Sequence, residues 1–188
     1  EYKLLGFENV GGKFTETQFY KAYKLGGVYL FDEIDASNPQ ALVALNAALE
    51  NGSCVFGNGE CVKMHEDFIV IAAANTYGAG ATHEYVGRTK LDAATVDRFV
   101  MLSWEYDEEL ERAITEARTP GYGAWVTKVQ KIRASVARAS GIKHVVSPRA
   151  SLRGAALLAA GVPESRVLQS VVFKGLPREQ VTSVMAGV

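Results

Sequence analysis

Two adjacent acids follow an apolar run in the first quarter of the chain. Asp32 and Glu33 come directly after residues 28–31, which lack polar alternation, as is typical of a strand covered on both faces of a parallel sheet. Open α/β sheets place ligands at the carboxyl ends of their strands. There Asp32 could hold Mg²⁺, directly or through water, while Glu33 orients and polarises an attacking water. The alternative is a simple polar turn after an apolar strand.

Two further residues follow the acids in a suggestive order. Asn75 comes after a second apolar run at residues 68–73, and Arg98 comes just before a third at residues 99–102. Asn75 could hydrogen-bond the attacking water or a terminal phosphate, or it could be an ordinary turn asparagine. Arg98 could face a neighbouring subunit's nucleotide as an arginine finger, or it could form a surface salt bridge.

A second cation lies where a helix is expected to begin. Ser147 and Pro148 form a typical helix start, with a capping serine and proline at the first position, so Arg149 falls in the first turn. A cation is disfavoured near the positive end of a helix unless an anion is close by. This position therefore favours contact between Arg149 and a phosphate.

In this order, the residues resemble the AAA+ ATPases of the helix-2-insert group, particularly the MoxR, cobaltochelatase-small-subunit and dynein-related branch. The resemblance covers essentially the whole chain. Its motifs are the insert at residues 4–14, the Walker B segment ending in Asp32 and Glu33, sensor 1 at Asn75, the finger arginine Arg98 within residues 91–99, and sensor 2 at residues 147–149 with Arg149. Residues 85–88 also resemble the stretch before the finger, which implies that Arg88 is a second interface arginine that contacts the nucleotide.

One expected motif is missing from the sequence. A phosphate-binding loop reads G-x-x-x-x-G-K-[ST] between a strand and a helix, so that backbone amides and a lysine cradle the phosphates. The nearest match, from Gly6 to Phe14, has one residue too many between its glycines, lacks the Ser or Thr, and follows no strand. Family members carry this loop upstream of the Walker B strand, so we expect it before residue 1.

Periodicity and capping predict the elements that position these residues. A capping box at residues 15–18 opens a helix that ends near residues 26–27, and a second helix runs from Asn38 and Pro39 to Asn51. A hairpin is expected at residues 53–64, and a short helix near residues 91–96. Strands are expected at residues 28–31, 68–73 and 99–102, and helices near residues 107–118, 122–140, 148–160, 163–173 and 178–186.

These elements predict an α/β fold of the P-loop NTPase (AAA+) class, incomplete at its N-terminus, at residues 1–106, followed by an all-helical lid at residues 107–188. The resemblance implies a sheet order of 5-1-4-3-2. Without its central first strand, the second and third strands of this chain are not expected to pair directly.

Composition excludes several classes of protein. The 188 residues are 48% hydrophobic and 22% charged, with a net charge of −1, which is typical of a soluble globular protein. No apolar run is long enough for a membrane helix and the first residues do not resemble a signal peptide, so we expect a cytoplasmic protein with no membrane partner. In that compartment Cys54 and Cys61 are expected to be free thiols, although a pair across the hairpin is the alternative.

The net charge hides a strong asymmetry. Residues 1–117 hold 9 Lys or Arg and 19 Asp or Glu, whereas residues 118–153 hold 8 Lys or Arg and no acid. Such a stretch is a solvated face, a phosphate contact or a docking surface for an acidic neighbouring subunit. The isoelectric point near 6.4 does not favour nucleic acid as a direct ligand, although the basic stretch keeps that open.

The resemblance implies ATP and Mg²⁺ as cofactors and hydrolysis of ATP to ADP and phosphate. It further implies a ring-shaped homo-oligomer, most plausibly a hexamer, that remodels a protein client, with von Willebrand A domain proteins as partners. Two alternatives stay open: the ATPase subunit of a metal chelatase, and an AAA+ interaction module that does not hydrolyse ATP. Because the phosphate-binding loop is missing, the 188-residue chain alone is expected to hydrolyse ATP poorly.

Overall fold

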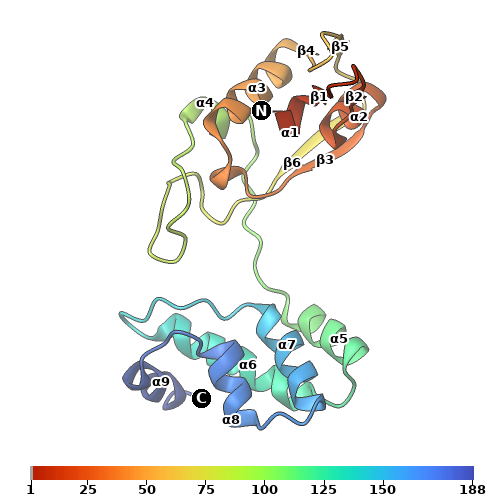
Figure 1. Ribbon diagram of the computed structural model, residues 1–188. Coiled ribbons are helices and arrows are strands. Elements are labelled where there is room, and N and C mark those ends of the chain that lie inside the picture. Colours follow the sequence, from red (N-terminus) through yellow and green to blue (C-terminus); the bar gives the residue numbers. More distant parts are fainter. Residues whose placement is uncertain (1) are drawn as a thin grey trace. The chain divides into compact units, whose positions relative to one another are not determined.

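The computed structural model describes residues 2–188, with side chains from residue 4 onward, and divides into two compact units (Figure 1). Unit 1 comprises residues 1–102 and unit 2 comprises residues 103–188. The sequence placed the change from α/β to helical structure at residue 106. Each unit has its own hydrophobic core.

Unit 1 is built on two parallel strands, β3 (Gly27–Phe31) and β6 (Phe68–Ala72), which lie side by side in Figure 1. Their register pairs Gly27 with Phe68 and Phe31 with Ala72, so the two strands end together. Both strands were expected from their apolar runs, and both are confirmed. The parallel pairing brings the segments after the two strands to one edge of the sheet.

Local capping explains the helices of unit 1. Helix α2 (Gln18–Leu25) is capped by Thr17, whose side chain accepts a hydrogen bond from the Tyr20 amide, so the cap lies two residues later than the predicted Thr15. Thr15 instead lies in a short antiparallel hairpin of β1 (Phe7–Glu8) and β2 (Phe14–Thr15), which follows α1 (Tyr2–Leu5). Helix α3 (Pro39–Asn51) begins after the Asn38 cap and ends at left-handed Gly52, as predicted.

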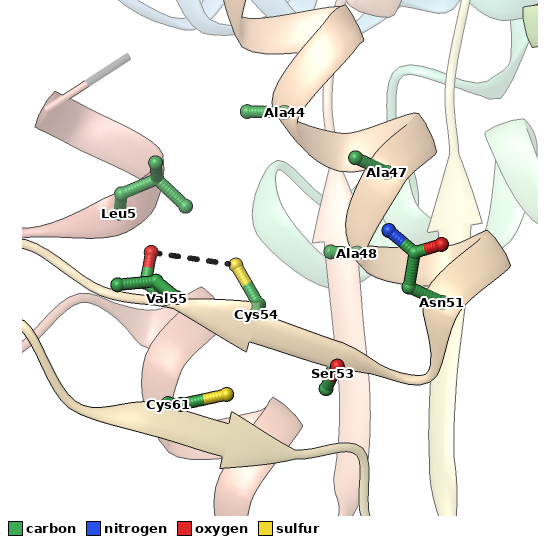
Figure 2. A pocket seen from close by; sticks show the side chains of 9 residues that line it. All are labelled: Leu5, Ala44, Ala47, Ala48, Asn51, Ser53, Cys54, Val55 and Cys61. Carbon is green, nitrogen blue, oxygen red and sulfur yellow. Dashed lines mark hydrogen bonds between the residues drawn. The ribbon is translucent and has the colours of Figure 1, made fainter.

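The predicted hairpin is formed by β4 (Ser53–Val55) and β5 (Cys61–Lys63). The register places Cys54 opposite Val62 and Cys61 opposite Val55, so the two cysteines do not face each other and both are free. Burial raises the pKa of the Cys54 thiol, with a smaller contribution from Cys61. Both thiols line a cavity of about 340 Å³ between the hairpin, α1 and the alanine-rich face of α3 (Figure 2).

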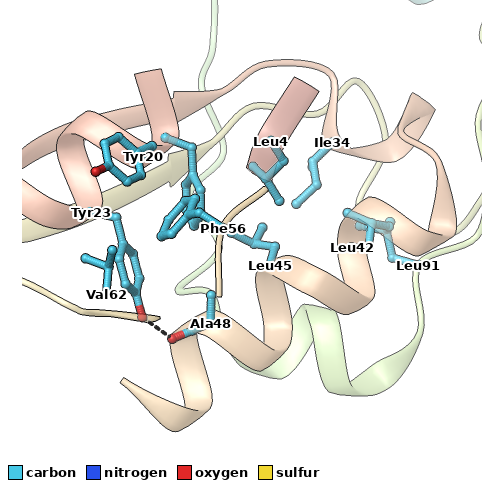
Figure 3. Packing of buried hydrophobic residues seen from close by; sticks show 11 residues of the cluster. Leu4, Tyr20, Tyr23, Ile34, Leu42, Leu45, Ala48, Phe56, Val62 and Leu91 are labelled. Carbon is cyan, nitrogen blue, oxygen red and sulfur yellow. Dashed lines mark hydrogen bonds between the residues drawn. The ribbon is translucent and has the colours of Figure 1, made fainter. Parts of the chain in front are cut away.

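Aromatic residues fill the core of unit 1. Phe19 and Tyr23 of α2 are fully buried and contact the ring of Phe68 on β6. Tyr23 also donates a hydrogen bond of 2.8 Å to the carbonyl oxygen of Ala48, which ties α2 to α3 (Figure 3). Leu45 of α3 is fully buried beside them. This core supports one face of the β3–β6 pair.

The other face of the two strands is exposed, which corrects the expectation of strands covered on both faces. Val28 and Leu30 of β3 are 60% and 57% exposed, and their cross-strand partners Ile69 and Ile71 are 55% and 50% exposed. The apolar run therefore alternates in burial, although it does not alternate in residue type. The physical reason is that no element of the described residues of unit 1 packs on this face.

The predicted third strand is also wrong for the described chain. Residues 99–102 follow the short helix α4 (Ala93–Asp97) and form no strand. Val100 is 90% exposed and Leu102 is 78% exposed. A strand needs a hydrogen-bonding neighbour, and within the described residues β6 pairs only with β3.

Unit 2 is entirely helical. Its elements are α5 (Glu108–Arg118), α6 (Gly123–Arg138), α7 (Pro148–Ala159), α8 (Glu164–Val167), a π-helical turn η2 (Leu168–Val172) and α9 (Arg178–Met185). All five predicted helical stretches are confirmed. Buried Trp125 of α6 donates a hydrogen bond to the Ser151 carbonyl oxygen of α7 and packs against Gly154. Among the described residues, no helix is both long and apolar enough to cross a membrane.

Candidate functional site

The predicted acids and the predicted sensor lie at the same edge of the β3–β6 pair. Backbone pairing continues beyond the strands, because the Ala73 amide donates to the Phe31 carbonyl and the Ile34 amide donates to the Ala73 carbonyl, both at 3.0 Å. Asp32 and Glu33 lie between Phe31 and Ile34, and Asn75 follows Ala73 by two residues. The structure therefore brings these three residues together.

The Asp32 side chain is exposed, and its Oδ1 accepts a hydrogen bond of 2.9 Å from the Glu33 amide. Its other oxygen has no hydrogen bond within the described residues. Mg²⁺ prefers hard oxygen ligands and is usually held by one or two carboxylates, with water and substrate phosphates completing the shell. No group of three or more His, Cys, Asp or Glu residues in the described part of the chain could hold a metal. The exposed Asp32 carboxylate, with one oxygen not hydrogen-bonded to a described residue, fits Mg²⁺ bound through a single carboxylate.

Glu33 has an unusual backbone conformation. Its φ of 55° makes it the only residue other than glycine with positive φ among the described residues. This left-handed conformation costs roughly 1 to 2 kcal/mol for a residue with a Cβ atom, and such strain clusters at functional sites. The Glu33 carboxylate is 61% exposed and forms an ion pair of 3.1 Å with Nη2 of Arg88.

Asp35 is a site residue that sequence reasoning did not single out. Its side chain is fully buried, and Oδ2 accepts three hydrogen bonds: from the Asn75 amide at 3.2 Å, the Thr76 amide at 3.0 Å and the Thr76 hydroxyl at 2.9 Å. Its Oδ1 accepts a fourth, from Nη1 of Arg88 at 3.2 Å. Asp35 lies in the short 3-10 helix η1 (Ile34–Ala36) after β3 and thereby joins it to the turn after β6 and the loop before α4.

Arg88 contacts two carboxylates of its own chain. Its side chain is 12% exposed, with Nη1 on Asp35 and Nη2 on Glu33. The hydrogen bond to Glu33 is the largest cause that raises the pKa of the Arg88 guanidinium. The resemblance implied a role for Arg88 at a subunit interface. Within this chain Arg88 lies with the acid cluster, which comprises Asp32, Glu33 and Asp35.

Asn75 presents its side chain to solvent. Its backbone amide is held by Asp35, while the carboxamide is exposed and has no hydrogen bond to another described residue. The side chain is therefore available to a ligand, while the backbone beneath it is fixed.

Arg98 lies at the C-terminal cap of α4, which packs on α3. Its Nη2 forms an ion pair of 3.0 Å with Glu50, and Nη1 donates to the Ala94 carbonyl oxygen. Its Nε is buried without a partner among the described residues. The salt bridge that the sequence left open as an alternative is present, and the structure places Arg98 with α3 and α4, not with the acid cluster.

Arg149 lies in unit 2, in the first turn of α7, and is exposed. It has no ion pair with a described residue. Within the basic stretch of residues 118–153, Arg133 is neutralised by Glu111 and Lys128 by Glu164. Other cations of that stretch, among them Lys131, Arg138, Lys143 and Arg153, are exposed on unit 2.

Comparisons with known proteins agree with the geometry of unit 1. Residues 2–99 match the model of the AAA domain family, dynein-related subfamily. Uncharacterized proteins of Staphylococcus aureus strains USA300, NCTC 8325 / PS 47 and COL are 32% identical over 113 residues, which cover 55% of this chain and 40% of each relative. The chain thus spans less than half the length of these curated relatives. The match brings with it the α/β fold of P-loop NTPases, and the chain belongs to the AAA domain family, dynein-related subfamily.

Proposed function

We propose that this chain supplies the magnesium-binding, water-activating and sensing residues of an AAA+ motor that hydrolyses ATP to ADP and phosphate. The observation that carries the proposal is the shared edge of β3 and β6, where Asp32, Glu33 and Asn75 lie together. Buried Asp35 supports the arrangement by holding the turn that contains Asn75.

Each residue has a role that suits its environment. Asp32 would hold Mg²⁺, which when bound neutralises charge on the β and γ phosphates. Glu33 is solvent-exposed at 61% and can accept a hydrogen bond from an attacking water. Asn75 offers a carboxamide to the same water or to the terminal phosphate. In this proposal Arg149 would contact the nucleotide, whereas Arg88 contacts Glu33 and Asp35 of its own chain.

The phosphates also need a cradle of backbone amides, and no G-x-x-x-x-G-K-[ST] sequence is present in the 188 residues. We propose that a phosphate-binding loop and its strand lie upstream of residue 1 in a longer protein. A strand inserted beside β6 would give residues 99–102 a hydrogen-bonding neighbour. A helix after it would cover the exposed face of Val28, Leu30, Ile69 and Ile71. In this longer protein unit 2 would serve as the helical lid.

The proposed assembly is a ring, most plausibly a hexamer, that acts in the cytoplasm on a protein client, with von Willebrand A domain proteins as candidate partners. Arg98 would act on the nucleotide of the neighbouring subunit. To do so it must exchange Glu50, an exposed partner, for a phosphate. Because exposed ion pairs contribute about 0 to 1 kcal/mol, this exchange has a small cost.

Mixing two inactive variants of the longer protein tests the proposal. Arg98→Ala should bind ATP normally but turn over about 10³-fold or more slowly, because an arginine finger stabilises charge on the transferred phosphoryl group. Glu33→Gln should do the same because water activation is lost. In mixed rings, intact Glu33 of one subunit meets intact Arg98 of another, so part of the ATPase activity should return.

The controls separate the possible failures. If subunits co-assemble and no activity returns at any ratio, titration with wild-type subunits decides between two causes. Activity proportional to wild-type content means that Arg98 acts within its own subunit, and collapse after one or two mutant insertions means that the ring needs every site. A wild-type longer protein that binds ATP without Mg²⁺-dependent turnover would refute the hydrolytic function and favour a non-hydrolysing module.

A further inference from the structure

We propose that Asp35 and Arg88 form a positioning pair that holds Glu33 in place relative to Asn75 during ATP hydrolysis; this inference rests on the proposed function. In this arrangement Asp35 is the buried anchor and Arg88 is the connector. Neither touches the reacting atoms, so both act through Glu33.

The anchor is Asp35, because its position is fixed from three directions. Its carboxylate is fully buried and accepts hydrogen bonds from the Asn75 and Thr76 amides and from the Thr76 hydroxyl. Its own carbonyl oxygen accepts a hydrogen bond of 2.7 Å from the Thr89 amide, one residue after Arg88. A buried carboxylate with this many donors cannot move without leaving them unpaired. It therefore sets the distance between the turn after β6 and the segment that carries Arg88.

The connector is Arg88, because its planar fork spans two acids. Nη1 binds Asp35 and Nη2 binds Glu33, at 3.2 and 3.1 Å. Arginine is suited to this task since its donors have a fixed geometry, whereas lysine offers a single point charge on a flexible stem. Only one oxygen of Glu33 is occupied by Arg88, which leaves Oε2 for a water molecule.

The position of Glu33 needs such support. Its side chain is mostly exposed, and its backbone is in the left-handed region that residues other than glycine rarely adopt. An exposed ion pair adds little to stability. The value of the Glu33–Arg88 contact therefore lies in orienting the carboxylate.

The test is a double-mutant cycle on ATP turnover in the longer protein. Arg88→Gln should lower kcat by about tenfold to a hundredfold, with KM for ATP within about twofold of wild type, because a misplaced base slows chemistry without weakening binding. Arg88→Lys should recover part of the loss, since the charge is kept but the fork is not. Lys90→Gln is the matched control: it removes a cation from the same loop, at an exposed position with no ion pair to a described residue, and should leave kcat and KM unchanged.

The cycle distinguishes positioning from a general structural effect. In a Glu33→Gln background, Arg88→Gln should change the residual single-turnover rate by less than about twofold, because Arg88 acts through the carboxylate that is already gone. The same fold-loss in both backgrounds would overturn the inference and leave the proposed function intact. Absence of ATPase activity in the wild-type longer protein would instead overturn the proposed function, and this inference with it. Asp35→Asn can replace Arg88→Gln in a second cycle. It should likewise lower the turnover rate in the wild-type background but change the residual rate by less than about twofold in the Glu33→Gln background.

Discussion

Replacing Asp35 by asparagine tests the buried anchor of unit 1 without any assumption about catalysis. The change keeps the shape of the side chain but removes its charge. Oδ2 accepts three hydrogen bonds, so the remaining oxygen of the asparagine is expected to stay with the Asn75 and Thr76 donors. The new NH₂ group then points toward Nη1 of Arg88, and two donors face each other where a charge-assisted hydrogen bond was present.

The size of the effect follows from burial. Asp35 is fully buried and Arg88 is 12% exposed. Breaking a buried ion pair by removing one partner costs about 3 to 5 kcal/mol. Arg88 keeps Glu33 as a second partner, so we expect the lower end, roughly 3 kcal/mol. Since about 1.4 kcal/mol corresponds to a factor of ten, this loss should speed amide hydrogen exchange through unfolding of unit 1 by about a hundredfold.

Hydrogen-exchange mass spectrometry of the 188-residue chain measures this effect, with peptides that cover β3 and β6 as the reporters. Both tryptophans, Trp104 and Trp125, lie in unit 2, so tryptophan fluorescence during urea unfolding follows that unit separately. Asp67→Asn is the matched control, because the Asp67 side chain is 81% exposed and its carboxylate lies 3.8 Å from the His65 ring. The control should change stability by less than about 0.5 kcal/mol.

The result that refutes the reasoning is exchange in the β3 and β6 peptides of Asp35→Asn within about twofold of the Asp67→Asn control. It would mean that the Asp35 contacts add nothing to the stability of unit 1. The positioning pair would then lose its anchor, whatever the ATPase assays show.

Two further predictions concern unit 2, and tryptophan fluorescence during urea unfolding reports both. Burial raises the pKa of Glu111, but hydrogen bonds from Arg133 and Ser151 outweigh it and leave the pKa below its usual 4.5. The folded state thus binds fewer protons than the unfolded state, so the Glu111 carboxylate stabilises unit 2 above about pH 4.5, and this stabilisation is lost as the pH falls further. Glu111→Gln should remove this pH dependence. If the free energy of unfolding falls equally in the variant and the wild type between about pH 7 and pH 3.5, the prediction is contradicted. In Gly154→Ala the new methyl group would lie 2.2 Å from Trp125, so we expect destabilisation by about 1 to 3 kcal/mol, and unfolding within about 0.5 kcal/mol of wild type would contradict this.

Local signals made much of the fold predictable. The Asn38 cap, Pro39 and Gly52 bound α3 as expected, and the glycine and proline breaks of unit 2 separate its helices correctly. These boundaries depend on a few neighbouring residues, so a single sequence contains the information. The cap of α2 was misplaced by two residues because Thr15 and Thr17 are chemically equivalent candidates.

Contacts between distant segments were not predictable in the same way. The apolar runs at residues 28–31 and 68–73 indicate strands, but residue type does not reveal that only one face would be covered. Residues 99–102 have a strand-like composition but lack a neighbour in the described chain. Asp35 was overlooked because its donors come from Asn75, Thr76 and Arg88, 40 to 53 residues away. The only sign of Asp35 in the neighbouring sequence is that it is a third acid, after Asp32 and Glu33, and that it follows the apolar Ile34.

The ion pairs of unit 1 divide the candidate site into a fixed part and an adjustable part. Asp35 is fully buried, so its bonds to the turn after β6 persist whenever unit 1 is folded. Glu50 is 67% exposed, so solvent screens its pair with Arg98, which contributes about 1 kcal/mol or less. A hydrogen bond to a charged phosphate contributes about 1.5 to 3 kcal/mol, which is enough to replace the Glu50–Arg98 pair. The Glu50 salt bridge of Arg98 is therefore compatible with a role as a finger, because a neighbouring nucleotide can displace Glu50 while the Asp35 anchor stays in place.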